Sequence, residues 1–565
     1  MKVGMFLAPF EQTLYSGISL PPHTLGVMTS YLRSKGNTVN QYDLNTDLLD
    51  CFGDGTLTKE DVKFIYDKAA ILGYLQGEEN LSIDRFIEKM LADKPVNSFE
   101  IAGVSLGGSF FWMPLHTGLL IGKYIKKKYK VPVVIGGNNM IYLDLFKDVY
   151  TELWQAITGA FKFVIVGAGP ESFHQIIQRL ESNPQWTPGQ HDIKGLAYMK
   201  NGEIFHHQQD ISLVIKPDFR GLRLDYYMNY LKDPGQSSNP REVERQNLDQ
   251  LFRWPTSLIQ FANTVYRKRD KGDFLKKLTI PYVFNYHCPY RCAFCAESDK
   301  NNQVVIGDPI RVVNDIEELL NEYDTEYIYF YNNYFNLSRK FVIAFCEEVK
   351  RRKLKFYWQD CARFDRVDPD LLQKMKESGC MTLWFGMETG GEKLMKMLNK
   401  KLNLQIIHEG LELCKKVGIW VNLEMIVGFP HETRKDFIKT VKFIRENLDR
   451  INFFQNNRYF VVPNSTMGKF PERFKIEIVK DVITYDSLLQ DNCKWFLSGE
   501  NLGQKPNNFH LYCFNETGGR NYDEIVSEGH KRLMHMHQLQ RREFTEMYQI
   551  LLFMDKIEKS KMAEK

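Results

Sequence analysis

The chain has 565 residues, of which 43% are hydrophobic and 25% charged, the profile of a globular protein with room for several domains. Its 74 basic and 70 acidic residues leave a net charge of +4, so composition does not favour nucleic acid or a membrane surface as a partner. Most of the ten cysteines are scattered singly, which excludes a secreted disulfide framework and favours a reducing cytoplasm.

The first 200 residues are predicted to alternate between strands and helices. A helix over 21–36 has Leu25, Met28 and Leu32 at helical spacing, and residues 45–98 form a charged helical insertion. Apolar strands that alternate with helices predict a doubly wound α/β domain, Rossmann-like or flavodoxin-like, with a parallel sheet covered on both faces. The predicted strands are 2–7, 38–44, 101–106, 131–137, the first part of 161–172, and 195–199.

Residues 101–122 contain no Asp, Glu, Lys or Arg and are long enough to span a membrane. Two glycines and Pro114 interrupt the stretch, so we expect a buried strand, a glycine turn and the start of a helix instead. The first residues lack a long apolar run and a small-residue cleavage site, so we expect no signal peptide.

A second run of strands and helices is predicted from residue 276 to 463, after a linker over 201–275 with a polar patch at 233–247. Repeated β/α units favour an α/β barrel or a partial barrel, in which chemistry lies at the carboxyl ends of the strands. Residues 464–565 are less regular and mostly helical, and we expect them to cap the barrel and to contact substrate. The predicted strands are 278–284, 326–333, 354–361, 381–390, 419–430 and 451–462.

Three cysteines stand close together directly after the first strand of this run. Cys288, Cys292 and Cys295 lie in YHCPYRCAFC with the spacing C-x3-C-x2-C. Three thiolates suit three corners of a [4Fe–4S] cluster and leave the fourth iron open to a small molecule. Zinc is the alternative, but structural zinc takes four ligands, and His287 is too close to Cys288 to supply the fourth without strain.

This motif resembles that of the radical S-adenosylmethionine (SAM) enzymes. Similar features are Phe294 before the last cysteine, FGMETG (385–390), IVGFPHET (426–433) and the segment 360–380. Together they extend over about 278–463, and the resemblance implies the partial, (β/α)6 form of the barrel. The chain departs from the family pattern at three places, where Asn332–Asn333 replace frequent acids, His431 a frequent glycine and Thr389 a frequent serine.

The resemblance implies that the three cysteines hold a [4Fe–4S] cluster, which binds SAM and cleaves it to a 5′-deoxyadenosyl radical. An external electron donor of the flavodoxin or ferredoxin type would reduce the cluster. Arg363 is a candidate for the SAM carboxylate and Glu388 for its amino or ribose groups, the alternative for both being a structural ion pair. The other SAM candidates are Phe294, Asn332 and Gly428.

The first 200 residues resemble the cobalamin-binding domain that precedes many radical SAM enzymes. Ligands of doubly wound sheets bind beyond the carboxyl ends of the strands, and glycine there lets the backbone approach a flat ring. No D-x-H-x-x-G motif is present, so we expect cobalamin without the histidine ligand of that motif. The alternative is a flavodoxin-like domain whose glycines only make turns. The cobalamin candidates are Ser105, Gly107, Gly136, Gly137, Gly167 and Gly169.

These features favour a cytoplasmic, cobalamin-dependent radical SAM enzyme, and foremost a methyltransferase that acts at an unactivated carbon or phosphorus of a natural-product or peptide substrate. The alternative is a cyclase or rearrangement enzyme with the same cofactors and no methyl transfer. A methylthiotransferase would carry a second three-cysteine set, whereas Cys51 is the only cysteine before Cys288. An iron–sulfur electron carrier would need no SAM pocket. We expect neither nucleic acid nor a membrane as a partner.

Overall fold

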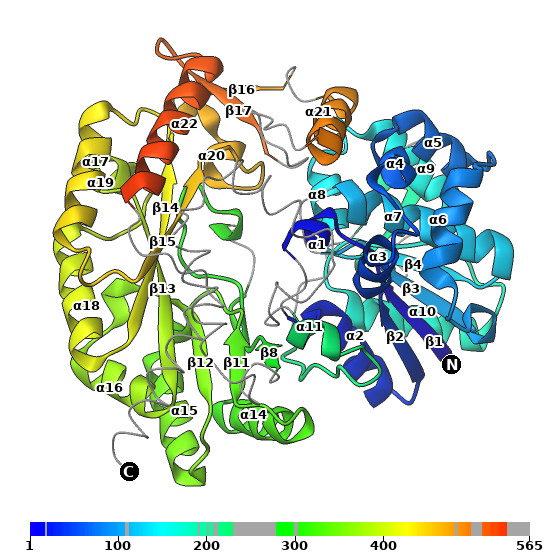
Figure 1. The fold of residues 1–565 in the computed structure, drawn as a ribbon, viewed down its shortest axis with the longest axis horizontal. Helices are drawn as coiled ribbons and strands as arrows, with labels where there is room; N and C mark the ends of the chain where they lie inside the picture. The colour runs from blue at the N-terminus through cyan, green and yellow to red at the C-terminus, as the bar shows by residue number, and fades with distance from the viewer. Residues whose placement is uncertain are drawn as a thin grey trace. The chain divides into compact units, whose positions relative to one another are not determined.

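The structure is a computed structural model that describes residues 1–16, 20–107, 112–189, 193–200, 203–206, 213–229, 278–298, 303–480, 484–498 and 511–539. The chain divides into two compact units (Figure 1). The first comprises Met1–Phe252 and Lys480–Leu511, and the second Arg253–Val479 and Tyr512–Lys565. The polar patch predicted at 233–247 lies outside the described residues.

The first unit contains a seven-stranded sheet with the order β2-β1-β3-β4-β5-β6-β7. Its first five strands are parallel and the last two antiparallel, which confirms the predicted doubly wound α/β class. Because the order reverses beside β1, the carboxyl ends of β1 and β3 form the point where such sheets bind ligands. The strands are β1 (Lys2–Leu7), β2 (Thr38–Asp43), β3 (Ile101–Ser105), β4 (Val133–Gly136), β5 (Phe163–Ile165), β6 (Leu196–Lys200) and β7 (Glu203–Phe205).

Helices pack on both faces of this sheet. The helices α2 and α10 bury Leu25, Leu32 and Ile176 against Val3 and Ile101 of the sheet. The helices of the unit are α1 (Glu11–Ser16), α2 (His23–Ser34), α3 (Leu44–Gly53), α4 (Lys59–Val62), α5 (Lys68–Gln76), α6 (Leu81–Leu91), α7 (Trp112–Tyr124), α8 (Asn138–Leu145), α9 (Thr151–Ala160), α10 (Gly169–Ser182), α11 (Asp225–Asn229) and α21 (Tyr485–Ser498). Short helical turns are η1 (Lys63–Tyr66), η2 (Val96–Ser98) and η3 (Ile125–Tyr129).

The uncharged stretch 101–122 forms the buried strand β3 and most of α7. Within the part of the chain that the structure describes, no helix has the length and apolar character that crossing a membrane requires. The face of α7 that carries His116 packs against α21, whose Tyr485 hydroxyl lies 2.9 Å from His116 Nε2. The Tyr485 ring also stacks on Trp112, with centroids 5.2 Å apart. One helix from the C-terminal region therefore completes the first unit.

The second unit contains a six-stranded parallel sheet with the order β15-β14-β13-β12-β11-β8. This order follows the chain from strand to strand, as in the predicted partial barrel, and helices lie along one face of it (Figure 1). The strands are β8 (Thr279–Tyr282), β11 (Tyr327–Phe330), β12 (Tyr357–Ala362), β13 (Cys380–Glu388), β14 (Trp420–Val427) and β15 (Phe453–Arg458).

The remaining elements of this unit surround the sheet. Its helices are α14 (Pro309–Glu322), α15 (Arg339–Arg352), α16 (Pro369–Glu377), α17 (Glu392–Met397), α18 (Leu404–Val417), α19 (Arg434–Glu446), α20 (Thr466–Lys469) and α22 (Tyr522–Leu539). Short helical turns are η6 (Ala296–Ser298), η7 (Phe335–Leu337), η8 (Phe364–Arg366) and η9 (Pro471–Phe474). Two antiparallel pairs complete it, β9 (Asn285–Tyr286) with β10 (Val305–Ile306), and β16 (Ile476–Val479) with β17 (Cys513–Glu516).

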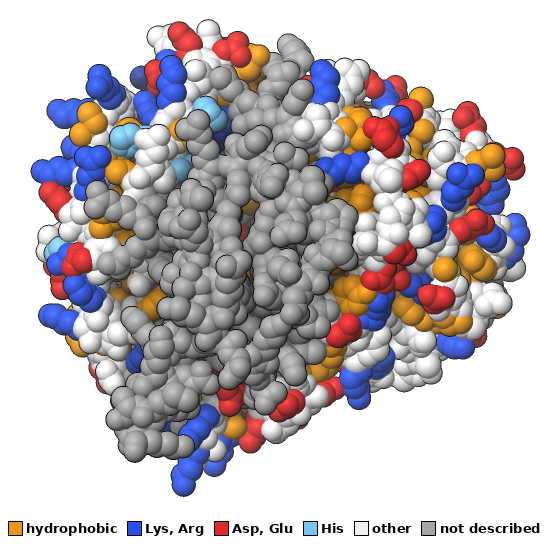
Figure 2. Space-filling model, in the orientation of Figure 1, with side chains coloured by type: hydrophobic (Ala, Val, Ile, Leu, Met, Phe, Trp, Pro, Cys, Tyr) orange, Lys and Arg blue, Asp and Glu red, His pale blue; other side chains and the backbone are white. Residues whose placement is uncertain are grey.

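Alternate residues of the six strands face the helices or the inside of the barrel. Phe330 and Trp358 pack against Phe345 of α15 and therefore face the helices. Their strand neighbours face inward, and by the pairing register Glu424 and Gln455 lie side by side on this inner face. On the face of the molecule drawn in Figure 2, the described acidic and basic side chains are interspersed over both units.

Candidate cofactor-binding site

The cysteine loop follows β8 and is held by backbone hydrogen bonds from two directions. Ala293 N donates to Leu398 O at 2.8 Å, and Ala293 O accepts from Met467 N at 2.9 Å. Cys295 N donates to Cys292 O at 3.1 Å, which closes a tight turn around Phe294. The loop thus has a fixed course at the carboxyl end of the first barrel strand, where the sequence places it.

The three thiols of the loop influence one another electrostatically. Burial raises the pKa of each of them, and for Cys295 burial together with the neighbouring thiols raises the pKa to about 12. Lys400 and Arg363 act in the opposite direction on the pKa of Cys292. Cys292 is buried, and Cys288 and Cys295 are partly exposed. Thiols with a raised pKa ionise more readily beside a strong positive partner, and iron is one.

Within the described residues, no three His, Cys, Asp or Glu side chains converge closely enough to share one metal ion. The thiolate ligands of a [4Fe–4S] cluster each bind a different iron, so they need not converge on one point. The thiol set with its neighbouring cations therefore fits a cluster.

Arg363 lies beside the thiols, directly after β12, and is only 2% exposed. Its Nε and Nη2 donate to the Asp365 carboxylate at 2.8 and 3.1 Å, so the ion pair considered as its alternative role is present. Its plane also stacks on the Tyr290 ring, 3.7 Å from the centroid. The third nitrogen, Nη1, is buried without a hydrogen-bond partner. A buried donor without a partner is costly, and a carboxylate ligand would satisfy it.

Glu388 ends β13 and forms a buried ion pair with Lys400, whose Nζ lies 2.7 Å from Glu388 Oε1. Its φ of 66° lies in the left-handed region, beside a register shift between β13 and β14. This turn lays the carboxylate over Gly386, where a Cβ would lie only 2.3 Å from Oε1. Burial alone would lower the pKa of Lys400, but Glu388 and Cys292 raise it above its usual value.

Asn332 has a different environment from Arg363 and Glu388. Its Oδ1 accepts from the backbone N of Phe284 and Asn285, both at 2.9 Å, and its Nδ2 donates to Asp360 at 2.6 Å. The side chain is buried and fixes the chain just before the cysteine loop. A direct contact of Asn332 with SAM stays a prediction.

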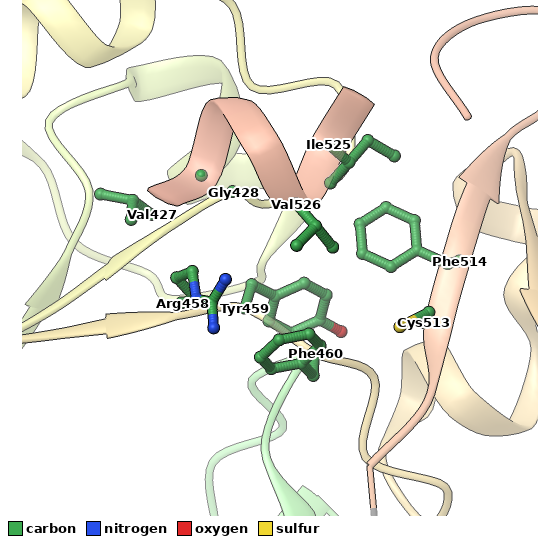
Figure 3. A pocket seen from close by; sticks show the side chains of 10 residues that line it. Val427, Gly428, Arg458, Tyr459, Phe460, Cys513, Phe514, Ile525 and Val526 are labelled. Atoms are coloured by element: carbon green, nitrogen blue, oxygen red, sulfur yellow. The ribbon is translucent and has the colours of Figure 1, made fainter. Parts of the chain in front are cut away.

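Phe294 and Gly428 lie on the side of the loop that packs against the end of β14. Phe294 packs edge-on against Phe429, with ring centroids 5.6 Å apart. Gly428 has a φ of 84°, and its N donates to Glu432 Oε2 at 2.6 Å. It also lines a small pocket between the ends of β14 and β15, β17 and α22, in which the Arg458 side chain lies near the Tyr459 and Phe460 rings (Figure 3).

The cobalamin candidates lie at the carboxyl edge of the first sheet. Ser105 ends β3, and its Oγ accepts from Gly107 N at 3.4 Å. Gly137 has a φ of 115°, and a Cβ on it would lie 3.0 Å from Leu106 N. The loops after β3 and β4 therefore approach each other closely beside the switch point. Gly136 ends β4, Gly167 follows β5 with a φ of 111°, and Gly169 begins α10.

Sequence reasoning missed two residues that contact this site. Lys400 pairs with Glu388, and Arg532 donates to the buried Glu432 at 2.8 Å. Lys400 lies in a charged stretch, NKKLN, that resembles a solvated turn. Arg532 is 100 residues from its partner and belongs to no motif.

Residues 282–444 match the family model of the radical SAM superfamily. Among curated proteins, an uncharacterized methyltransferase of Pyrococcus horikoshii is 29% identical over 28% of this chain and 35% of its own length. An anaerobic magnesium-protoporphyrin IX monomethyl ester cyclase of Cereibacter sphaeroides is 28% identical over 55% of this chain and 44% of its own. The matches thus span less than half the length of these relatives.

Solved structures resemble the chain over both units. The radical SAM methyltransferase TsrM from Kitasatospora setae, with cobalamin and a [4Fe–4S] cluster bound, superposes with a TM-score of 0.55 at 15% identity, over 94% of this chain and 89% of its own. The radical SAM enzyme OxsB, with aqua-cobalamin and SAM bound, gives 0.54 at 13% identity, over 94% of this chain and 56% of its own. At sequence identities this low, the superpositions establish the fold alone.

The second unit contains the residues that match the radical SAM superfamily, with three cysteines after its first barrel strand. Residues 282–444 belong to the radical SAM superfamily, and the chain has the fold of solved radical SAM structures that carry a doubly wound domain ahead of the barrel. The resemblance of the sequence to radical SAM enzymes with a preceding cobalamin-binding-type domain is thereby confirmed.

Proposed function

We propose that the chain is a cobalamin-dependent radical SAM methyltransferase that acts at an unactivated carbon or phosphorus of a natural-product or peptide substrate. The observation that carries the proposal is the group of three thiols beside Arg363, whose buried Nη1 has no hydrogen-bond partner. A cluster on Cys288, Cys292 and Cys295, together with SAM, would supply a one-electron cleavage that starts radical chemistry.

In this proposal, residues of the chain bind SAM and orient it. Arg363 holds the SAM carboxylate through Nη1, while Asp365 keeps the guanidinium in place. Glu388 accepts from the amino or ribose groups of SAM. Phe294 and the backbone of Gly428 flank the adenine or ribose.

The polar side chains on the inner wall of the barrel favour a polar substrate. Gln455 and Asn457 of β15 are exposed and face inward, and Asn457 Nδ2 lies 3.5 Å from Glu424 Oε2 on β14. Amide and carboxylate groups on one wall suit a substrate with several hydrogen-bonding groups, as a peptide or a polar natural product has.

In this proposal cobalamin, bound at the carboxyl edge of the first sheet, would carry the methyl group to an unactivated position. A Cβ on Gly137 would meet backbone atoms of Leu106 and Gly107, whereas the Phe10 side chain packs against Gly107. Exposed backbone at Gly137 beside an aromatic ring suits a flat ligand ring. The methyltransferase names of two similar proteins favour this reaction. The cyclase of Cereibacter sphaeroides, which matches over 55% of the chain, favours ring formation as the second candidate.

The test is anaerobic purification and reconstitution with iron, sulfide and cobalamin, followed by metal analysis and an assay for 5′-deoxyadenosine. We expect about four irons and one cobalt per chain, with 5′-deoxyadenosine released after reduction. Iron without cobalt would leave the radical chemistry and exclude methyl transfer from cobalamin. Zinc in place of iron would exclude the whole proposal. Product mass separates the two reactions, because only methylation adds a CH2 unit.

A further inference from the structure

A short turn after α17, residues 398–400, contacts three separate parts of the candidate site. Leu398 O accepts from Ala293 N in the cysteine loop, and Asn399 Nδ2 donates to Arg291 O of the same loop at 2.8 Å. Lys400 O accepts from Arg363 Nη2 at 3.0 Å, and Lys400 Nζ donates to Glu388 Oε1 at 2.7 Å. Consecutive residues thus link the cysteine loop with the two charged side chains expected to hold SAM.

The geometry of this turn is energetically costly. Asn399 and Lys401 have φ values of 54° and 56°, in the left-handed region that residues other than glycine seldom adopt. Lys400 between them is buried, although an ammonium group loses much hydration energy on burial. A buried ion pair adds little net stability compared with apolar residues of the same size, so stability alone does not explain why a lysine occupies this position.

The side chain of Lys400 lies between the groups that matter for binding. Its Nζ is 5.7 Å from the centre of the Phe294 ring, which is adjacent to Cys295 in the chain. It occupies the space above Gly386, where a Cβ would lie 2.6 Å from Nζ. Lys400 is therefore enclosed by the cysteine loop on one side and the end of β13 on the other.

We propose that Lys400 is a positioning residue, which fixes the Glu388 carboxylate through its ammonium group and the Arg363 guanidinium through its carbonyl so that both meet SAM beside the cysteine loop. This inference rests on the proposed function. It assigns to Lys400 an effect on SAM affinity that is measured separately from cluster assembly, because the ammonium group donates its hydrogen bond to Glu388 and not to a cysteine ligand.

The experiment compares Lys400→Met, Lys400→Arg and Lys401→Met with the wild-type chain, all reconstituted anaerobically. Lys401 is the matched control, because it is the next residue, carries the same charge and is exposed. Iron per chain is measured first, and the dissociation constant for SAM is then measured by equilibrium dialysis. The change in the electron paramagnetic resonance spectrum of the reduced cluster on addition of SAM gives an independent readout of binding.

We expect Lys400→Met to keep the wild-type iron content and to raise the SAM dissociation constant about 10- to 100-fold. Lys400→Arg should restore part of the affinity, and Lys401→Met should match the wild type. The double variant Glu388→Gln/Lys400→Met buries no unpaired charge, so it guards against misfolding of the single variant. If Lys400 acts through Glu388, this double variant should bind SAM no more weakly than Glu388→Gln alone.

Two results would overturn the positioning role while leaving the proposed function intact. One is a SAM dissociation constant of Lys400→Met within about twofold of the wild type. The other is a parallel loss of iron and SAM in Lys400→Met and in the double variant, which would make Lys400 a structural support of the cysteine loop. A wild-type chain that holds iron and binds no SAM would instead overturn the function itself.

Discussion

Gly386 is the residue whose substitution tests the packing of the charged pair most directly. In Gly386→Ala the new Cβ would lie 2.3 Å from Glu388 Oε1 and 2.6 Å from Lys400 Nζ. Both partners are buried and cannot move apart without losing their contact. We expect the free energy of unfolding of the second unit to fall by about 1–3 kcal/mol, measured by urea denaturation of the chain without cofactors.

The control for this substitution is Gly159→Ala in α9. A Cβ at Gly159 would meet no atom within 4 Å, so the helix should gain stability by about 0.5–1 kcal/mol. Equal effects of the two substitutions would show that space around Gly386 is not limiting.

At the residue scale, the sequence identifies the groups of a motif but not the partners that hold them. The spacing of the three cysteines predicts their place after β8, because the motif is local. Glu388 and Arg363 are recognisable from residue type and motif, whereas the Lys400 contact depends on the turn through Asn399. No sequence pattern identifies an asparagine with a left-handed backbone in a stretch of polar residues. The ion pair between Lys400 and Glu388 is therefore visible only in the tertiary structure.

Helix α1 carries a buried carboxyl group that links two elements of the first unit. Glu11 is 1% exposed, and its Oε1 accepts from Met113 N at the start of α7 at 3.3 Å. Burial raises the pKa of Glu11 from 4.5 to about 7. The folded unit therefore binds more protons than the unfolded chain between these values, and this contribution to stability is complete below pH 4.5 and lost as the pH rises through about 7.

We expect Glu11→Gln to remove this pH dependence. The wild-type unit should lose of the order of 3 kcal/mol between pH 4.5 and 8 from this group, and the variant should lack that slope. The measurement is urea denaturation of both proteins over this pH range. A variant with the same slope as the wild type would assign the pH dependence to other groups.

A buried ion pair attaches α22 to the loop after β14. Arg532 Nη1 donates to Glu432 Oε2 at 2.8 Å, and the same oxygen accepts from Gly428 N. In Arg532→Met the Glu432 carboxylate would remain buried without its cation, which costs about 3–5 kcal/mol. We expect α22 to detach and proteases to cleave near it sooner. Lys442→Met is the control, because its pair with Glu446 is 73% and 59% exposed and contributes about 0–1 kcal/mol.

Strands and helices are predicted well from the sequence where their pattern is strong. The sequence predicts all six barrel strands near the positions where they occur, but several are shorter than predicted. The strands predicted over 278–284, 326–333 and 451–462 are limited to Thr279–Tyr282, Tyr327–Phe330 and Phe453–Arg458. The sequence does not predict the antiparallel pair β16–β17, because its two short strands are more than thirty residues apart in the chain. The sequence does not predict that α21 packs on the first unit either. The amphipathic pattern of a helix shows that one face is buried, but not against which element.

At the scale of the whole molecule, each of the two units contains one candidate cofactor site. The cysteines lie in the second unit and the glycine edge in the first. We expect the variant with Cys288, Cys292 and Cys295 all changed to Ser to lose its iron and to keep cobalamin binding, measured by metal analysis and by the visible spectrum of the corrin. Loss of cobalamin together with iron would show that the two sites depend on each other.

The fold class could be predicted at this scale because the alternation of apolar strands and helices extends over most of the chain. Substrate and reaction could not, because the inward-facing residues of the barrel, such as Gln455 and Asn457, follow no family motif.

The position of α21 has a consequence for how the protein is made. Tyr485 packs beside Trp112 and His116, so the first unit lacks part of its aromatic core until the ribosome has translated α21. Residues 278–479 of the barrel are translated before α21, because they lie in the sequence between the two segments of the first unit. Expression of residues 1–229 alone would therefore yield a first unit without α21, and a nonsense codon before residue 485 would remove α21 from the first unit as well as α22 from the second.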